Sequence, residues 1–494
     1  MFKPESWQST TEYRTNLDLV LHRLSRNPKA YGTFQYSDII DKMRSLSLDE
    51  AGLYIQKLYS DFGRPAKHQA QIIRSTILFS LLFNKTPAGT SLTSWVRNVL
   101  PRSPLFIALV GCGSPEDLPP LGSYYDLMNR LWQGDREKYS RNFLLPKGKN
   151  GKKPKKTIGT DGKLCEDGSI KTADIVQRIM DGEPATADNP EGVLQELFCI
   201  LGIMPSLRLG LIDSGNLTVS GDGTAVVSHS TPFGHRPKSD PSGELRHYPD
   251  PDAGWGFDSS KKTWYFGETL YIIACTNKTF GIDLPLTMRF TEARRHDSIN
   301  FLYSFDDFGR HSWGLSPKNI CLDSAHDNIP AYRLLDHWDI NALIDINGRT
   351  RSSENAPDDI LLNKEGHPVC KCGREMCPWG NDPLKDAHKY RCPLKCGRIE
   401  SCEHEKECSP GTYGRTVYIK NQGDLRFQTR IPRDSDEYKK IYNERTACER
   451  LNQRFLNDYK LQHLKIRGKD HFSFWTMVIG ICIHLDARAK AASI

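Results

Sequence analysis

The sequence predicts an α/β protein in which a mixed sheet is flanked by helices, with an all-α N-terminal domain and a cysteine-rich, β-containing insertion. Three features predict this. Apolar residues recur at helical spacing over roughly the first 140 residues, and β-branched and aromatic runs follow from residue 216. Seven of the fourteen cysteines fall between 370 and 408. A chain of 494 residues, 38% hydrophobic, is long enough for about two to four domains.

Helical spacing is clearest in HQAQIIRSTILFSLLF (68–83) and SLTSWVRNVL (91–100). The stretch KGKNGKKPKK (147–156) then places six lysines among Gly, Asn and Pro, a composition that forms no core and suits a flexible basic linker. Its charge is consistent with a contact to a DNA backbone and equally with a solubilising loop. Further helices are predicted at 173–182 and 191–210.

Strand-like segments begin after this helical part. They lie at 216–228, 263–276, 284–290, 319–324 and 340–346. The helix NIPAYRLLDHW (328–338) separates the last two, so sequential strands are followed by a strand, a helix and a strand. This order predicts a mixed sheet flanked by helices. Two later pieces, TVYIK (416–420) and DLRFQTR (424–430), predict further β structure, and a helix resumes at 437.

The cysteine cluster favours metal binding over a disulfide framework, which would be spread along a short secreted chain. Tetrahedral zinc takes four Cys or His ligands, usually as two close pairs separated by a loop. Cys372 with Cys377 and Cys392 with Cys396 supply such pairs, although their spacing is looser than in a C-x2-C pair. They are the predicted ligands of a structural zinc ion, with reduced free thiols as the alternative.

Two acidic residues stand where predicted strands end: Asp222 in VSGDGTAV and Asp323 in ICLDSAHD. A carboxylate at such a position is held by rigid backbone and still faces solvent. A third, Glu449, lies in YNERTACERL (442–451), where Tyr442 and Arg445 would share its stripe of one amphipathic helix.

Three carboxylates from two strands and a helix can bind two hard divalent ions that activate phosphodiester chemistry. Arg445 would donate to a phosphate, and Tyr442 would donate to a phosphate or stack on a base. Each residue also has a structural explanation: Asp222 capping a turn, Asp323 on the surface, and Arg445 paired with Glu449. The combination favours the metal site, with Asp213, Asp327 and Glu444 as competing acids.

In this combination the chain resembles the DDE transposases of bacterial insertion sequences, of the type whose last acid lies in a Tyr-x2-Arg-x3-Glu helix. The matching segments are VSGDGTAV, ICLDSAHDNIPAYRLLDHWDINALIDINGR and YNERTACERL, supported by YPDPDAGWGFDSSKKTWYFGETLYIIA and EARRHDS. In the N-terminal half, GRPAKHQAQIIRSTILFSLLF, SPLFIALVGC and DLPPLGSYYDLMNRLW are similar to the helical leader of that family.

The resemblance implies an RNase H-like core that uses two Mg²⁺ or Mn²⁺ ions to cut and join DNA at the ends of a mobile element. It implies Asp222, Asp323 and Glu449 as the catalytic, metal-binding acids. The expected domains are a helical DNA-binding domain (1–140), a basic linker with connecting helices (141–215), two parts of the catalytic core (216–348 and 437–494) and a cysteine-rich zinc subdomain between them (349–436).

DNA contacts are expected from Tyr442, Arg445, Arg450 and Lys460. The family often carries Lys seven residues after the Glu, where this chain has Leu456, so Arg450, Arg454 or Lys460 would take its place.

The alternative function is a catalytically inactive or domesticated DNA-binding protein, and a simple nuclease is a third. The expected partners are terminal inverted repeats and target DNA, with a dimer in the active complex. The segment FSFWTMVIGICIHL (472–485) is too short for a spanning helix of about 20 residues, so it predicts a buried core helix. No signal-peptide pattern stands at the N-terminus, and a cytoplasmic, bacterial protein that does not enter membranes is expected.

Overall fold

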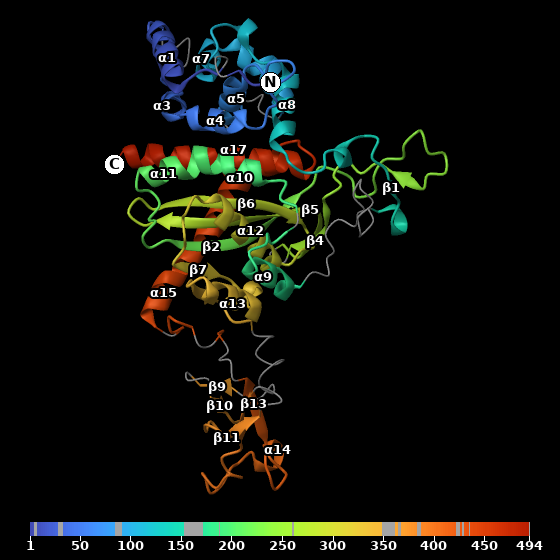
Figure 1. Cartoon of the computed structure of the whole chain (residues 1–494), viewed down its shortest axis with the longest axis vertical. Coiled ribbons are helices and arrows are strands. Elements are labelled where there is room, and N and C mark those ends of the chain that lie inside the picture. Colours follow the sequence, from blue (N-terminus) through green and yellow to red (C-terminus); the bar gives the residue numbers. More distant parts are fainter. Residues whose placement is uncertain are drawn as a thin grey trace. The chain divides into compact units, whose positions relative to one another are not determined.

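A computed structural model describes the chain except for residues 4–6, 28–32, 84–90, 153–170, 187, 259–260, 348–360, 364–366, 383–386, 421–424, 427–428, 434 and 494. Part of the predicted basic linker therefore lies outside the described residues. The chain is mixed α/β and divides into two compact units (Figure 1). Unit 1 comprises Met1–Pro317 with Thr446–Ile494, and unit 2 comprises Lys318–Arg445.

Unit 1 begins with helices, as predicted. They are α1 (Thr10–Leu24), α3 (Ser37–Ser45), α4 (Asp49–Gln56), α5 (Gln69–Leu82), α6 (Leu92–Ser94), α7 (Pro104–Val110) and α8 (Leu121–Leu131). The apolar α5 is the central helix of this group and is buried along almost its whole length. Its Ser75 hydroxyl accepts a hydrogen bond from the Trp95 indole at 2.9 Å and lies 2.7 Å from the Tyr124 hydroxyl, so these three side chains form a hydrogen-bonded cluster within the core.

The sheet of unit 1 is antiparallel and is built around one long strand. Its strands are β2 (Thr218–Val227), β4 (Gly254–Asp258), β5 (Thr263–Asn277) and β6 (Ile282–Glu292). Strand β5 pairs with β2 along one edge and with β4 and then β6 along the other. A short pair, β1 (Leu145–Pro146) with β3 (Leu245–Arg246), lies apart from it. The predicted strands at 216–228, 263–276 and 284–290 are thus confirmed.

Helices cover both faces of this sheet. They are α9 (Thr172–Met180), α10 (Gly192–Phe198), α11 (Met204–Arg208), α12 (Asp297–His311), α16 (Thr446–Gln453) and α17 (Lys469–Ala492). Alternation along β2 separates the faces, because Ser220 and Asp222 contact α16 whereas the Cα of Gly223 faces Asp297 of α12. Figure 1 shows α10, α11 and α17 running together beside the sheet.

The predicted apolar helix at 472–485 is the buried middle of α17. His484 is fully buried there, with Nδ1 2.8 Å from the Ser206 hydroxyl and Nε2 2.8 Å from the carbonyl of Pro285. Burial lowers the pKa of His484 to about 3, so it is a neutral core residue. Among the described residues, no helix is long and apolar enough to cross a bilayer.

Unit 2 contains a strand, helix, strand arrangement and the cysteine-rich insertion. Strands β7 (Asn319–Leu322) and β8 (Asn341–Ile344) are parallel, α13 (Ile329–His337) connects them, and α15 (Asp436–Tyr442) follows the insertion. The insertion holds β9 (Leu361–Leu362), β10 (Pro368–Val369), β11 (Cys377–Asp382), β12 (Ala387–Arg391), α14 (Glu405–Cys408) and β13 (Thr416–Lys420). Strands β11, β12 and β13 form an antiparallel sheet.

Two sequence predictions in this region were wrong. The segment 424–430 was expected to be a strand, but its residues 425 and 426 lie in a turn. The helix around YNERTACERL was expected to be continuous, but α15 ends at Tyr442, a 3₁₀ turn spans Asn443–Arg445, and α16 begins at Thr446. A 3₁₀ turn has about three residues per turn, so residues on either side do not keep a single α-helical stripe.

Candidate functional site

In unit 1 the carboxylate of Asp222 is held by the helix that carries Glu449. Cys448 anchors α16 on the sheet, because its buried thiol donates to the carbonyl of Ser220 at 3.1 Å. One turn further along, the side-chain amide of Asn452 donates to Oδ2 of Asp222 at 3.0 Å. Asp222 is half-buried and Glu449 is exposed. Glu449 lies three residues before Asn452, one helical turn away on α16.

α16 and the turn after it have one buried face. Cys448, Leu451 and Phe455 are fully buried, whereas Glu449 and Arg450 are exposed. Asn452 was missed by the sequence reasoning. The Asn452 side chain is nearly buried. In the sequence, the only sign of its role is that an amide side chain follows the candidate acid Glu449 by three residues.

Glycines flank Asp222 and one of them permits a close approach from the other face of the sheet. A Cβ at Gly223 would stand 2.5 Å from Oδ1 of Asp297 and 3.1 Å from the Thr269 methyl. Successive side chains on a strand point to opposite faces, so Asp297 is separated from Asp222 by the sheet. The competing acid Asp213 accepts backbone N–H groups of Gly215 and Asn216 at 3.0 and 3.2 Å, which makes it a turn-forming residue.

In unit 2, Asp323 directly follows β7 and is tied to a buried histidine. Its Oδ1 accepts the backbone N–H of Ala325 at 3.0 Å and lies 2.6 Å from Nδ1 of His326, which is 1% exposed. Burial raises the pKa of Asp323, but the hydrogen bond and charge of His326, the Ala325 N–H and the Arg445 guanidinium together hold it below its usual range. Asp323 is therefore ionised at neutral pH.

A second carboxylate, Asp345, stands at the same edge, where parallel strands β7 and β8 both end. Its backbone N–H donates to the carbonyl of Leu322 at 3.2 Å. The Tyr442 hydroxyl donates to the same carbonyl at 3.2 Å, and the Asp345 carboxylate lies close enough to raise the pKa of Tyr442. Burial and Asp345 raise the pKa of Tyr442, so this phenol stays protonated. The sequence reasoning missed Asp345, although INALIDI places an acid directly after a strand.

Tyr442 and Arg445, predicted to contact DNA, therefore lie within unit 2 beside Asp323. The Arg445 guanidinium carbon is 6.0 Å from the centre of the Tyr442 ring, and that ring stacks on Tyr438 at 5.7 Å. The competing acid Asp327 is nearly buried and accepts the backbone N–H of Asn347 at 2.8 Å, a contact that fixes the loop after β8.

The basic residues after Glu449 differ in their partners. Arg450 forms a two-pronged ion pair with Asp283 of β6, with N–O distances of 2.5 and 2.7 Å. Arg454 is paired with Asp486 of α17 at 2.5 Å. Lys460 has no ion pair among the residues that the structure describes, and of the three it is the one whose charge is left for an external anion.

The structure holds no cluster of three or more His, Cys, Asp or Glu side chains arranged for a metal ion within the described part of the chain. Asp222, Asp323 and Glu449 nevertheless are oxygen donors of the kind that Mg²⁺ and Mn²⁺ prefer. Two observations support their fit to these ions: all three side chains are carboxylates, and Asp222 and Asp323 are each held by a hydrogen bond to a neighbouring side chain.

Five cysteines of the insertion contact one another in two groups. Cys370 and Cys372 are 2.8 Å apart at sulfur, and Cys372 also hydrogen-bonds Cys402. Cys396 hydrogen-bonds Cys377 instead. The four predicted zinc ligands, Cys372, Cys377, Cys392 and Cys396, thus belong to different contacts, and burial raises the pKa of the Cys372 and Cys396 thiols. All cysteines of the described part are free thiols.

Exposed aromatic side chains gather on the β4–β5 hairpin. Trp264 lies on β5, and 67% of its surface is exposed. Its ring meets Phe257, itself 52% exposed, at 5.3 Å between centroids, and the ammonium of Lys152 lies 5.0 Å from the ring of Trp255. Solvent-facing rings beside a lysine are a surface on which unpaired bases can stack.

A buried acid that the sequence did not single out lies further along β5. Glu268 is 1% exposed, and neither of its carboxyl oxygens has a hydrogen-bond partner among the described residues. Burial, followed by the charges of Asp250 and Asp252, raises its pKa well above the usual range, so the group is protonated at neutral pH.

Neither the family models nor the curated proteins compared with this sequence match it.

Proposed function

We propose that this protein is a DDE-type transposase that binds the ends of a mobile DNA element and catalyses metal-dependent DNA cleavage and strand transfer on an RNase H-like core. The observation that carries the proposal is the setting of the acids. Asp222 is fixed by Asn452 on the helix that bears Glu449, and Asp323 is fixed by His326 at the carboxyl edge of parallel strands. The resemblance of the surrounding segments to that family supplies the reaction class.

Asp222, Asp323 and Glu449 would hold two Mg²⁺ or Mn²⁺ ions. Such ions activate the attacking oxygen and stabilise the leaving oxygen of a phosphodiester. The chain's own residues prepare this arrangement. Asn452 orients Asp222 through one hydrogen bond, and His326 keeps Asp323 ionised and oriented.

Tyr442 and Arg445 would contact the DNA strand. Because its pKa is raised, Tyr442 stays protonated at neutral pH, and on binding a phosphate oxygen its O–H would exchange the carbonyl of Leu322 for that oxygen. Arg445 offers a planar set of donors that matches a phosphate. Lys460 would neutralise a further phosphate, whereas Arg450 and Arg454 are engaged by Asp283 and Asp486. The working complex would be at least a dimer, since two element ends must be processed together.

The test is cleavage of a labelled duplex that carries the DNA flanking this protein's gene, in Mg²⁺, by the wild type, Glu449→Gln and Glu444→Gln. Glu444 is the nearby competing acid, so its variant makes the same chemical change outside the proposed set. Cutting at defined terminal positions should fall by more than about a hundredfold in Glu449→Gln, because even residues that only orient metal ligands contribute about 10- to 100-fold. It should persist in Glu444→Gln.

Other outcomes would assign other functions. Sequence-specific binding with no cleavage by any of the three proteins would favour the alternative, a catalytically inactive or domesticated DNA-binding protein. Cutting scattered along the duplex would favour a simple nuclease. Cleavage that survives in Glu449→Gln and disappears in Glu444→Gln would reassign the third acid.

A structural zinc ion in the insertion is a separate proposal. The support for it is the density of reduced thiols, since Cys372 and Cys396 each contact another cysteine sulfur. Zinc stabilises such small subdomains by binding their thiolates. The expected result is about one zinc or more per chain in the purified protein, measured by atomic emission, and a loss of zinc in Cys372→Ser or Cys396→Ser. Metal-free protein with an unchanged melting temperature would exclude it.

A further inference from the structure

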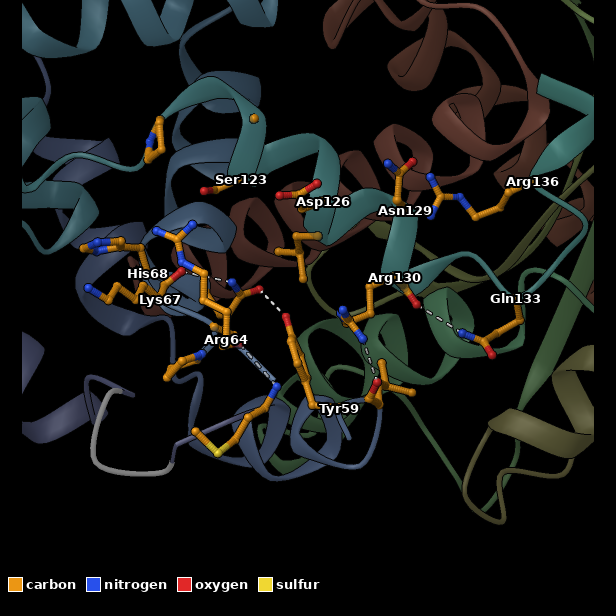
Figure 2. A pocket seen from close by; sticks show the side chains of 18 residues that line it. Tyr59, Arg64, Lys67, His68, Ser123, Asp126, Asn129, Arg130, Gln133 and Arg136 are labelled. Carbon is orange, nitrogen blue, oxygen red and sulfur yellow. Dashed lines mark hydrogen bonds between the residues drawn. The ribbon is translucent and has the colours of Figure 1, made fainter. Parts of the chain in front are cut away.

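A cavity in the helical region has a volume of about 1060 Å³ and is open to solvent (Figure 2). It lies wholly within unit 1, between the segment that precedes α5 and the helix α8 with the residues after it. Figure 2 shows Arg64, Lys67 and His68 on one side and Arg130 and Arg136 on the other. This volume is about that of a pocket for a drug-sized ligand, which is much more space than a single phosphate needs.

The charges around this cavity are strongly unequal. Four cationic side chains line it, those of Arg64, Lys67, Arg130 and Arg136, against a single carboxylate, that of Asp126. All four cations are exposed. Arg64, Lys67 and Arg136 form no ion pair with any residue of the described chain. Unlike a charge on a solvated face, these cations converge on one concave surface, where their fields add.

The walls of the cavity are fixed rather than loose. The Tyr59 hydroxyl donates to the side-chain oxygen of Gln69 at 2.8 Å. The guanidinium of Arg130 lies 4.1 Å from the centre of the Tyr59 ring and donates to the carbonyl of Leu58 at 3.1 Å. The backbone N–H of Ala66 donates to the carbonyl of Met1 at 2.8 Å, which holds the loop that carries Arg64. The cations are therefore presented by a preformed surface.

We propose that this cavity binds the phosphates of a DNA strand and is a second DNA-contact site, distinct from the acidic residues. The ligand class follows from the excess of unpaired cations and from the volume, which admits several backbone groups rather than one ion. That the polyanion is DNA rests on the proposed function.

The test measures binding of a fluorescent 30-base-pair oligonucleotide without divalent metal, so that no cleavage occurs. The variants are Arg64→Ala/Arg136→Ala and the stronger Arg64→Glu/Arg136→Glu. Arg26→Glu is the matched control, since Arg26 is exposed in the same helical region outside the cavity. Melting temperatures of all variants establish that they are folded.

Each phosphate contact contributes about 0.9 to the slope of log affinity against log salt on duplex DNA. Loss of two contacts should lower the slope by about 1.8, which corresponds to an affinity that falls about 12-fold less between 50 and 200 mM salt. Arg26→Glu should leave the slope nearly unchanged. Equal slopes for the wild type and the folded double variants would overturn the proposal.

A competition arm separates the two sources of phosphate. If 10 mM inorganic phosphate or pyrophosphate protects the wild type against heating, and this protection but not DNA affinity is lost in Arg64→Ala/Arg136→Ala, the cavity is a free-anion site and the DNA assignment fails. The result is independent of catalysis. If the cavity binds DNA but the wild-type protein cuts no DNA in Mg²⁺, the proposed function fails and this site stands.

Discussion

His326 should control the protonation of Asp323, and its replacement should move the acid limb of the pH profile of DNA cleavage. Nδ1 of His326 lies 2.6 Å from the Asp323 carboxylate, and the imidazole is buried. A hydrogen bond to a charged group contributes about 1.5 to 3 kcal/mol. One pKa unit corresponds to about 1.4 kcal/mol. Removing this contact in His326→Ala should therefore raise the pKa of Asp323 by about 1 to 2.

The direction of the pKa change follows from the effects that remain at Asp323 when His326 is removed. Burial alone raises the pKa of Asp323, and the contacts of His326 are the largest of the effects that lower it. Without them, the metal-binding ionised form is lost at a higher pH. Cleavage by His326→Ala should then decline on acidification about 1 to 2 pH units earlier than cleavage by the wild type, while the rates converge toward pH 8. A purely structural His326 would lower the rate equally at every pH.

Stability gives a readout that needs no activity. The folded-state pKa of Asp323 is lowered, so its ionised form stabilises the fold above the unfolded pKa of about 3.9, and this contribution is lost as the pH falls through the folded pKa. The unfolding free energies of the wild type and His326→Ala should differ most near neutral pH and approach each other below pH 4. His337→Ala is the control, because His337 is exposed at the end of α13. A difference independent of pH would refute the reasoning.

Three further predictions concern unit 1. Asn452→Ala removes the 3.0 Å hydrogen bond to Asp222 and should raise the Mg²⁺ concentration for half-maximal cleavage about 10- to 100-fold; an unchanged Mg²⁺ titration would contradict a positioning role. Glu268→Gln should raise the free energy of unfolding in urea more at pH 8 than at pH 4.5. The pKa of Glu268 is raised in the folded protein, so the wild type loses stability as the pH rises above the unfolded pKa of this residue. A difference between the two proteins that does not change with pH would contradict this prediction. Trp264→Ala should weaken single-stranded DNA binding by roughly 1 to 3 kcal/mol, whereas Phe34→Ala, at an equally exposed ring, should not; equal affinities would show that Trp264 stacks on no base.

The sequence predicted well those elements whose pattern is set by local burial. The strand around Asp222 and the apolar run of α17 carry periodicity over ten or more residues, and both were placed correctly. The prediction for 424–430 was wrong at residues 425 and 426, because the alternation of apolar and polar residues in this segment is short. Trp264 shows a related limit, since an aromatic residue in a strand pattern does not reveal whether another layer covers it.

Side-chain partners were largely beyond the sequence because they depend on tertiary contacts. The pairing of Arg450 with Asp283 joins residues 167 positions apart, and no local rule distinguishes it from an arginine left for DNA. The hydrogen bond between Asn452 and Asp222 spans 230 positions. Asp345 could have been recognised, because it follows a parallel strand beside the strand that ends at Asp323, and such strand ends lie at one edge.

The 3₁₀ turn at Asn443–Arg445 changes how the segment YNERTACERL (442–451) should be understood. Tyr442 and Arg445 belong with Asp323 and Asp345 in unit 2, whereas Glu449 belongs with Asp222 and Asn452 in unit 1. The spacing Tyr-x2-Arg-x3-Glu is therefore not explained by one stripe of a helix. It places the two residues proposed to bind phosphate and the acid proposed to bind metal on separate structural units within eight residues of chain. Each half has its own anchor, the Tyr442 hydroxyl on Leu322 and the Cys448 thiol on Ser220, so each functional group is oriented by the unit to which it is fixed.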